Sequence, residues 1–473
     1  MTLNGPGDWL LSFRCQRVRT EVKGLSTVYS DFIIDTQYDQ LKPEVTGQAK
    51  KLILDLVGVS LAGYKLMEFP RLVVNYMESM GGTPEATILQ TKKKFPSINA
   101  AFANAACAHA LDMDDGHRFG ALHPGTVIIP AAIAAAELSK VDTRDLIAGV
   151  VTGYEVMIRI GAAINPSSLN RGFHATGITG PFGAASAAAK IMKLTHEETI
   201  GALGLAGLQG SGLLQVNHEG EGAKVKPINP ARAAMSGLLS CILAQRGARG
   251  PLDIFEGEDG FLKAVTDEVK PDLLTRNLGK EFEICNAYVK FYSACRHAHA
   301  PIDAAFEALK DSPIQPSDIA RIHVETYPAA IRLAGITNVT TPSAARFSIP
   351  FSVALALIKR DANADKYCEE NVRDQGIQDL ARRVALSVGE KWEKLYPNKR
   401  GATVRIFDQQ GAEWSAEVEL AKGEPENPAS WEEVYQKFQT NAALALSEQE
   451  VHELGERILH LEERSVDELV QLL

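Results

Sequence analysis

Residues 111–125 place ionisable side chains between two apolar segments. The stretch reads LDMDDGHRFGALHPG and contains Asp112, Asp114, Asp115, His117, Arg118 and His123. The segments on either side, AAFANAACAHA and TVIIPAAIAAA, consist of the small and apolar residues typical of buried helices. Burial of polar groups is unfavourable unless they are paired, so this pattern indicates a functional site. The alternative is a paired polar turn in which Pro124 begins the second helix.

Two loops further along the chain offer more polar groups. His174 follows Arg171 in the segment RGFH before an apolar helix, and it is either an ordinary loop histidine or a catalytic one. Lys224 and Lys226 precede a helix that begins near Pro230. The first turn of a helix attracts anions, and ammonium groups beside it strengthen the attraction, so the lysine loop is a candidate anion site. The alternative is a solvated turn.

A further polar segment lies where the character of the sequence changes. Its sequence, KFYSACRHAHAP, contains Lys290, Cys295, Arg296, His297 and His299 just before a predicted helix. Two histidines separated by one residue could bind a metal, but no carboxylate or Cys/His pair accompanies them at metal-ligand spacing. We therefore expect no metal site.

The four polar segments together combine two chemical abilities. Carboxylates and imidazoles transfer protons, and ammonium and guanidinium groups bind carboxylates, with arginine able to form two parallel hydrogen bonds to one carboxylate. This combination suits elimination, or removal of a proton next to a carboxylate.

The composition restricts the class of protein. The chain has 473 residues, of which 45% are hydrophobic and 23% are charged, as in soluble proteins of two domains. A net charge of −10 without a dense Lys/Arg run argues against nucleic-acid binding. No apolar run reaches the roughly 18 residues that cross a membrane. The scattered cysteines predict reduced thiols and a cytoplasmic location, and no GxGxxG or Walker pattern follows a predicted strand.

Hydrophobic periodicity predicts a mainly α protein. Helices are expected over residues 43–62, 69–80, 125–138, 143–164, 182–193 and 230–245. After residue 280 we expect a strand at 319–327, a hairpin at 402–407 and 414–420, and helices at 347–359 and 371–384. We predict an N-terminal extension over residues 1–24, rather than a targeting segment. A large all-helical domain then covers residues 25–280 and is completed by 430–473, and a smaller α+β lid domain covers 281–429.

The order of these segments along the chain resembles the MmgE/PrpD family, which includes 2-methylcitrate dehydratase, cis-aconitate decarboxylase and iminodisuccinate epimerase. The segments that carry the resemblance are residues 54–63, 111–124, 172–174, 226–234, 290–299, 346–350 and 423–428. The resemblance extends from about residue 25 to the end. It implies a helical domain with a smaller α+β lid, a homodimer, no metal, no cofactor and a pocket between the domains.

The resemblance also implies roles for individual residues. We expect the catalytic residues to be Asp112, His123, His174 and Lys226. We expect the substrate-binding residues to be Asp115, His117, Lys290, Cys295, Arg296 and His299. Asp112 or His174 would remove a proton next to a substrate carboxylate, and His123 would protonate the departing hydroxyl. Coupled neighbours can exchange such roles, so the assignment of acid and base stays open.

Three positions depart from the pattern of the family's decarboxylases. Gly116 stands where these enzymes often have threonine after the paired aspartates, and Asn229 stands where the lysine loop often has histidine. Cys295 occupies a position that is histidine in animal-type decarboxylases and cysteine in many bacterial members. Cys295, followed by Arg296, favours a reaction other than decarboxylation and leaves the exact substrate open.

The sequence therefore predicts a cofactor-independent lyase that acts on a small di- or tricarboxylate. Dehydration of a 2-methylcitrate-like hydroxy acid is the first expectation. Decarboxylation of cis-aconitate and epimerisation of an amino dicarboxylate remain open, because both need the same kinds of residue. A non-enzymatic alternative is an anion-binding protein with an inactive pocket, for which Gly116 and Asn229 are the support. No nucleic-acid or membrane partner is expected.

Overall fold

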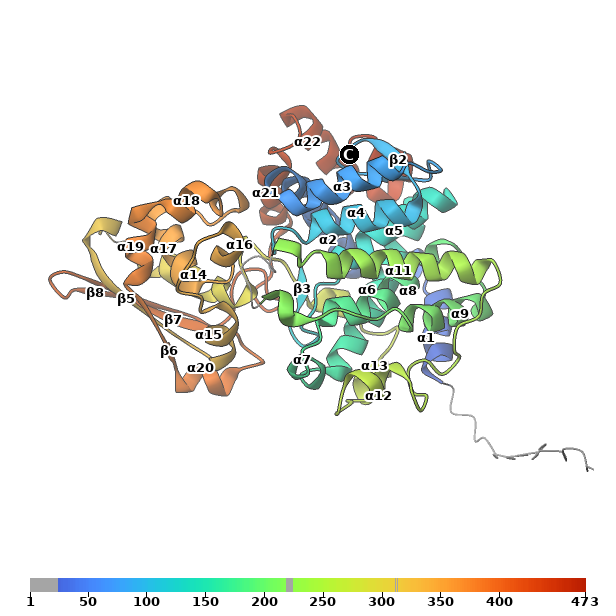
Figure 1. Ribbon diagram of the computed structural model, residues 1–473, viewed down its shortest axis with the longest axis horizontal. Helices are drawn as coiled ribbons and strands as arrows, with labels where there is room; N and C mark the ends of the chain where they lie inside the picture. The colour runs from blue at the N-terminus through green and yellow to red at the C-terminus, as the bar shows by residue number, and fades with distance from the viewer. Residues whose placement is uncertain (1–23, 218–223, 311, 313) are drawn as a thin grey trace, which may run out of the picture.

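The chain folds into a large helical part and a smaller α+β part (Figure 1). The structure, a computed structural model, describes residues 24–217, 224–310, 312 and 314–473. The predicted fold class is confirmed. Each part has its own large hydrophobic core: one draws on residues 29–289 and 429–473, and the other on residues 294–421. Except for Gly24, the predicted N-terminal extension lies outside the described residues.

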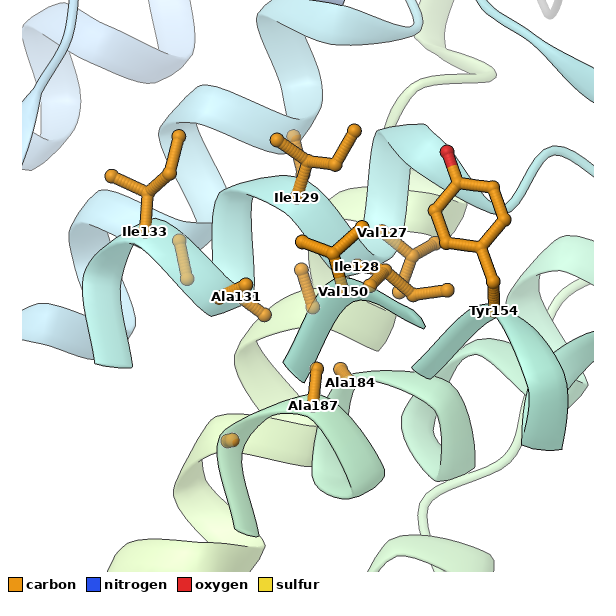
Figure 2. Packing of buried hydrophobic residues seen from close by; sticks show 14 of the residues in the cluster. Val127, Ile128, Ile129, Ala131, Ile133, Val150, Tyr154, Ala184 and Ala187 are labelled. Atoms are coloured by element: carbon orange, nitrogen blue, oxygen red, sulfur yellow. The ribbon is translucent and has the colours of Figure 1, made fainter. Parts of the chain in front are cut away.

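Six long helices form the centre of the helical part. They are α2 (Pro43–Leu66), α4 (Ser97–Ala108), α5 (Gly125–Ser139), α6 (Thr143–Ile164), α8 (Ala175–Ile191) and α11 (Ile228–Gln245). Figure 2 shows how branched side chains of α5, among them Ile128, pack against Val150 and Tyr154 of α6 and against Ala184 and Ala187 of α8. Small residues let these helices approach closely. A Cβ atom added at Gly153 of α6 would lie 2.8 Å from the carbonyl oxygen of Gly183 in α8.

The start of α8 differs from the prediction. The sequence suggested a helix from residue 182, because proline usually ends or begins a helix. The structure begins α8 at Ala175 and continues it through Pro181. The proline ring leaves the carbonyl of Gly177 without its helical partner, and Arg232 of α11 donates to that oxygen at 3.1 Å. A tertiary contact thus compensates for the lost helical hydrogen bond.

Shorter elements complete the helical part. They are α1 (Leu25–Asp35), α3 (Glu68–Met80), α7 (Ser167–Asn170), α9 (His196–Gly207), α12 (Phe261–Val265), α13 (Asp272–Thr275) and the hairpin of β1 (Ala86–Ile88) and β2 (Lys93–Phe95). The predicted capping box of Thr195 and Glu198 is present at the start of α9. Among the described residues, α6 is long and apolar enough to cross a membrane, but 94% of its apolar window is buried in the protein.

The C-terminal segment returns to the helical part. It forms α21 (Trp431–Ala442), α22 (Glu448–Leu459) and α23 (Val466–Val470), and α21 packs along α2 (Figure 1). Capping boxes begin all three helices, with Ser430, Ser447 and Ser465 as the N-caps. A buried ion pair of 2.5 Å joins Lys437 of α21 to Asp55 of α2.

The α+β part is built on a four-stranded sheet with the order β6-β5-β7-β8. Its strands are β5 (Ile319–Thr326), β6 (Val384–Val388), β7 (Ala402–Asp408) and β8 (Glu413–Val418). β5 runs parallel to β6, and the other two pairs are antiparallel. The surrounding helices include α14 (His299–Ala308), α15 (Pro328–Ala334), α16 (Pro342–Ala345), α17 (Ile349–Lys359) and α20 (Glu390–Leu395).

The predicted helix over residues 371–384 was wrong in its extent. The structure divides this region into α18 (Glu369–Arg373), α19 (Gln375–Arg382) and the start of β6. Asp374 causes the break, because its side chain accepts a hydrogen bond from the backbone N–H of Ile377 and so begins a new helix. Val384 follows and pairs with Ile322 of β5.

Candidate active site

Asp112 lies at the centre of the candidate site. Its backbone has φ +50°, a left-handed conformation that aspartate tolerates better than most residues, and it follows the end of α4. The Asp112 carboxylate oxygen Oδ1 accepts from Lys226 Nζ at 3.0 Å and lies 3.3 Å from Lys290 Nζ. Lys290 also donates to the Asp112 carbonyl oxygen at 2.6 Å. Two ammonium groups, from the segment before α11 and from the segment after β4 (Ala287–Tyr288), therefore meet at one residue.

These ammonium groups determine the charge state of Asp112. Burial by itself raises the pKa of the carboxyl, but the charges of Lys226 and Lys290 outweigh burial and hold the pKa well below its ordinary value. Asp112 is therefore ionised at neutral pH and is a weak base. Because one carboxylate faces two ammonium groups, the trio retains one positive charge.

Two histidines share the carboxylate of Asp114. Nδ1 of His109 lies 2.8 Å from Asp114 Oδ2, and Nδ1 of His123 lies 3.3 Å from the same atom. The rings of the two histidines meet edge to face, with centroids 4.8 Å apart. Burial lowers the pKa of His109 to about 4, so its imidazole is neutral at neutral pH. His109 was not predicted, because it occupies the apolar flank of the motif and looks like a packing residue there.

The position of His123 fixes which ring nitrogen is available. Nδ1 of His123 lies 2.8 Å from the carbonyl oxygen of Asp115, which only accepts hydrogen bonds, so Nδ1 carries a proton. In a neutral ring the Nε2 lone pair is then available to a substrate. The His123 backbone N–H donates to the hydroxyl of Thr176 at 3.0 Å, which ties this loop to the start of α8.

His174 stands at the N-cap position of α8, 6.1 Å from His109 between ring centroids. The side-chain amide of Asn229 donates to Nδ1 of His174 at 3.1 Å, so the ring proton lies on Nε2. Burial and the charge of Lys226 lower the pKa of His174 well below its ordinary value. Asn229, one of the departures from the decarboxylase pattern, thus orients a neutral histidine.

Asp115 and His117, predicted to bind substrate, have other partners in the structure. Asp115 accepts from the hydroxyl of Tyr154 at 2.7 Å and from the N–H of Gly125 at 2.9 Å, and burial raises its pKa to about 8. His117 accepts from Gly120 N–H at 3.0 Å and lines a different cavity, described below. The side chains of Asp115 and His117 thus have partners outside the Asp112 cluster, and their predicted substrate-binding role stays a prediction.

A steric contact explains why position 116 is occupied by glycine. β3 (Gly116–His117) pairs with β4, and Gly116 lies opposite Tyr288. A Cβ atom added at Gly116 would lie 2.4 Å from the Tyr288 hydroxyl oxygen. Tyr288 therefore occupies the space that a threonine side chain would need at this position.

Arg296 and His299 are held by the protein itself. Arg296 Nη2 lies 2.9 Å from Glu424 Oε1, and Arg296 Nε donates to the same oxygen at 3.0 Å. Nδ1 of His299 lies 3.2 Å from Arg296 Nη1, and Nε2 lies 3.2 Å from the Ala294 carbonyl oxygen. Both ring nitrogens of His299 are engaged, so these two predicted substrate-binding residues are placed as structural partners of the 423–428 loop.

Cys295 lies close to the central cluster. Burial raises the pKa of its thiol, and the charge of Asp112 raises it further. The Cys295 backbone N–H donates to the carbonyl oxygen of Arg346 at 2.8 Å. The thiol is therefore a neutral group on the α+β side of the site.

Several supporting residues were not among the predicted site residues. Ser293 donates to the Leu111 carbonyl oxygen at 2.7 Å and accepts from Arg346 Nε at 3.0 Å. Lys437 of α21 donates to the Met113 carbonyl oxygen at 3.0 Å. These contacts hold the backbone on both sides of Asp112. Ser293 and Arg346 occur in segments that carry the family resemblance, and Lys437 has no local sequence signal.

The central cluster also has the donor atoms of a cation site. Atoms of His109, Asp112, Asp114 and His123 lie within 4.8 Å of one another. However, two ammonium groups already contact Asp112, and Oδ2 of Asp114 faces two imidazole Nδ1 atoms. The charge of the lysines opposes a metal cation at this position. The arrangement suits proton transfer beside a bound anion.

The fold and the site together define a two-part protein whose candidate site combines ammonium groups, carboxylates and imidazoles. Residues 28–274 match the MmgE/PrpD N-terminal domain, and residues 292–462 match the MmgE/PrpD C-terminal domain. The chain belongs to the MmgE/PrpD family.

Relatives of known name share most of the chain. Cis-aconitate decarboxylase of Aspergillus terreus is 27% identical over 459 residues, which cover 92% of this chain and 93% of the relative. Cis-aconitate decarboxylase of Homo sapiens is 24% identical over 469 residues, covering 93% and 92%. Cis-aconitate decarboxylase-like protein oryM of Aspergillus oryzae is 28% identical over 300 residues, covering 60% and 61%. These relatives support membership of a family of enzymes that act on carboxylates.

Proposed function

We propose that this protein is a lyase that acts on a small tricarboxylate. The observation that carries the proposal is the group of Asp112, Lys226 and Lys290, which retains one positive charge beside neutral imidazoles. A substrate carboxylate would complete the charge balance of this buried group. Lys226 is the better placed of the two lysines, because Lys290 also binds the Asp112 carbonyl oxygen.

Proton transfer is the second part of the proposal. The low pKa of Asp112 makes it a poor base, so we assign it to holding the two lysines in position. His123 Nε2 is available as a proton acceptor, because Nδ1 already donates. His174, with its proton on Nε2, is available as a donor. This pairing reverses the acid role expected for His123 from the sequence.

Decarboxylation of cis-aconitate is the first candidate reaction, and the full-length similarity to cis-aconitate decarboxylases supports it. In this reaction the bond to the departing carboxylate breaks, its electron pair moves into the adjacent carbon framework, and a carbon takes up one proton as carbon dioxide leaves. The site would supply a cation for a remaining carboxylate and an imidazole as the proton donor.

Dehydration of a 2-methylcitrate-like hydroxy acid is the second candidate, and Cys295 and Gly116 favour it because they depart from the decarboxylase pattern. Here a base removes the proton next to a carboxylate, and an acid protonates the departing hydroxyl, so water leaves. Both an acceptor and a donor are required, and His123 and His174 would supply them.

Proton NMR of the purified protein in deuterated buffer tests the proposal. The panel contains cis-aconitate, 2-methylcitrate, citrate and iminodisuccinate. Itaconate formed from cis-aconitate would support the first reaction, and replacement of the methyl doublet of 2-methylcitrate by the methyl singlet of an unsaturated tricarboxylate would support the second. Exchange of deuterium without net conversion would favour an epimerase. No reaction with any compound, together with saturable binding of a tricarboxylate, would favour the anion-binding alternative.

The assembly and location belong to the same proposal. Family resemblance suggests a homodimer, and light scattering coupled to size-exclusion chromatography tests it. The scattered positions of the cysteines favour a cytoplasmic location, and fractionation of cells that produce the protein tests that part.

A further inference from the structure

A second cavity lies between the helical part and the α+β part. Its volume is about 800 Å³. The helical part contributes residues from segments 117–121, 162–169 and 270–286, and the α+β part contributes Tyr396, Pro397, Arg400, Pro425 and Glu426. Asp112, His123, His174 and Lys226 do not line it. The cavity is thus distinct from the candidate active site, although both use the loop that follows Asp115.

Basic groups outnumber acidic groups on the cavity wall. Among the described residues, the charged lining groups are Arg118, Lys270, Arg276 and Arg400 against Glu283 and Glu426. Arg118 pairs with Glu426, and Glu283 lies 3.5 Å from Nε2 of His117. The wall therefore keeps a positive excess in a protein of net charge −10. Such a surface attracts anions against the overall field of the molecule.

Two arginines on this wall have donor atoms without partners. Arg118 is 7% exposed, and its Nε and Nη1 atoms have no hydrogen-bond partner among the described residues. The Nε atom of Arg400 is likewise buried without one, while Arg400 Nη2 donates to the Arg118 carbonyl oxygen at 2.6 Å. Arg118 Nη1 lies 3.8 Å from Glu424 Oε2, which is too far for a hydrogen bond, so the two guanidinium groups keep donor capacity that the protein does not use.

The rest of the wall is apolar and partly aromatic. Phe119, Leu169, Leu273 and Tyr396 line the cavity. The volume lies within the range of about 300–1,000 Å³ that is typical of pockets for drug-sized ligands and cofactors. A small tricarboxylate would fill only part of it and would leave the apolar wall without contacts.

We propose that this cavity binds a phosphorylated organic anion with an aromatic or apolar body, of the size of a nucleotide or coenzyme A. The phosphates would meet Arg118, Arg276 and Arg400, and the body would lie against Phe119 and Tyr396. The sequence lacks glycine-rich phosphate loops, but those motifs supply backbone donors in particular folds. Here arginine side chains supply the donors, and guanidinium groups match phosphate geometry well.

Isothermal titration calorimetry of the full chain with ATP, coenzyme A and inorganic phosphate tests the proposal. No substrate is present, so the outcome does not depend on the proposed lyase activity. We expect ATP or coenzyme A to bind with micromolar affinity and inorganic phosphate to bind much more weakly. Whether ATP or coenzyme A binds shows which organic group the apolar wall of the cavity accepts. No binding of ATP or coenzyme A at millimolar concentration, or equal affinity for inorganic phosphate, would overturn the proposal.

Variants locate the binding site. Arg276 is exposed at the cavity, so Arg276→Glu should fold normally and weaken binding by about tenfold or more. Arg246→Glu makes the same charge change at an exposed position at the end of α11, away from the cavity lining, and should bind like the parent protein. Ala162→Trp places an indole ring at the cavity wall without changing its charge and should weaken binding. Equal weakening by Arg276→Glu and Arg246→Glu, or unchanged binding by folded Ala162→Trp, would overturn the assignment to this cavity.

Discussion

Two buried charged clusters lie on either side of the 111–125 loop, and they differ in charge balance. Around Asp112, one carboxylate faces the two ammonium groups of Lys226 and Lys290. Around Glu424, the guanidinium of Arg296 is held by two contacts to one carboxylate oxygen, at 3.0 and 2.9 Å. In the first cluster two ammonium groups contact one carboxylate, whereas in the second Arg296 contacts its carboxylate one to one, with Arg118 Nη1 3.8 Å from the other Glu424 oxygen.

Charge balance distinguishes residues that could bind a ligand from residues that stabilise the fold better than residue type does. Both clusters contain histidine and basic residues, and the sequence assigned members of both to substrate binding. A buried charge that already has its partner stabilises the fold, whereas an uncompensated one provides binding energy for a ligand. The imidazoles of His123 and His174 stand beside the uncompensated cluster, which is where proton transfer to a bound anion is useful.

The largest expected effect is on turnover. His123→Ala removes a proposed proton-transfer group from the first cluster, and we expect kcat to fall by roughly 10²–10⁴-fold on the substrate found by NMR. His452→Ala, at an exposed position of α22, is the matched control and should leave kcat unchanged. If His123→Ala turned over substrate at the parent rate, the proposed role of His123 in proton transfer would be wrong.

Arg296→Met tests the balanced cluster. The substitution leaves the Glu424 carboxylate buried without its main partner, and we expect the free energy of unfolding to fall by about 3–5 kcal/mol. Denaturation in urea measures the change. The double variant Arg296→Met/Glu424→Met should recover a large part of the loss, because it removes both charges. A double variant less stable than the single one would contradict the pairing.

Lys226→Met tests the unbalanced cluster. Asp112 keeps Lys290 as a partner, so we expect little loss of stability. The substrate carboxylate loses its cation, and we expect KM to rise by about 10–100-fold, corresponding to the loss of a charged hydrogen bond. Steady-state kinetics measure this change, with Lys263→Met on the exposed side of α12 as the control. An unchanged KM would show that Lys226 does not bind substrate.

The smallest expected effect is a dependence of stability on pH. The pKa of His109 is about 4 in the folded protein and about 6.5 when unfolded, so between these values only the unfolded chain binds the proton. His109 therefore contributes a fall in stability as the pH is lowered from about 6.5 to about 4, at up to about 1.4 kcal/mol per pH unit, whereas Asp115, with a pKa of about 8, contributes a slope of opposite sign. Burial also lowers the pKa of His299, which adds a slope of the same sign as that of His109. Urea denaturation across this range should show a smaller slope for His109→Gln, and an unchanged slope would contradict a neutral buried His109.

Local sequence patterns were sufficient for much of the fold. The apolar helix over residues 143–164, the strand that begins at residue 319 and the capping box of Thr195 and Glu198 all appear where predicted. These features depend on periodicity and on contacts within a few residues, so they can be read from neighbouring positions. The extent of α8 could not, because Arg232 supports the carbonyl that Pro181 leaves unpaired.

The sequence by itself determined which residues could do chemistry, and the tertiary structure decided which of them lie together. Lys226 is 114 positions from Asp112, and Lys290 is 178 positions away, yet both contact it. His109 joined the site only because the end of α4 brings it to Asp114, and Arg296 left it because Glu424 neutralises it. Charge compensation and pKa depend on distance and burial in space. Residue type and spacing along the chain do not contain that information.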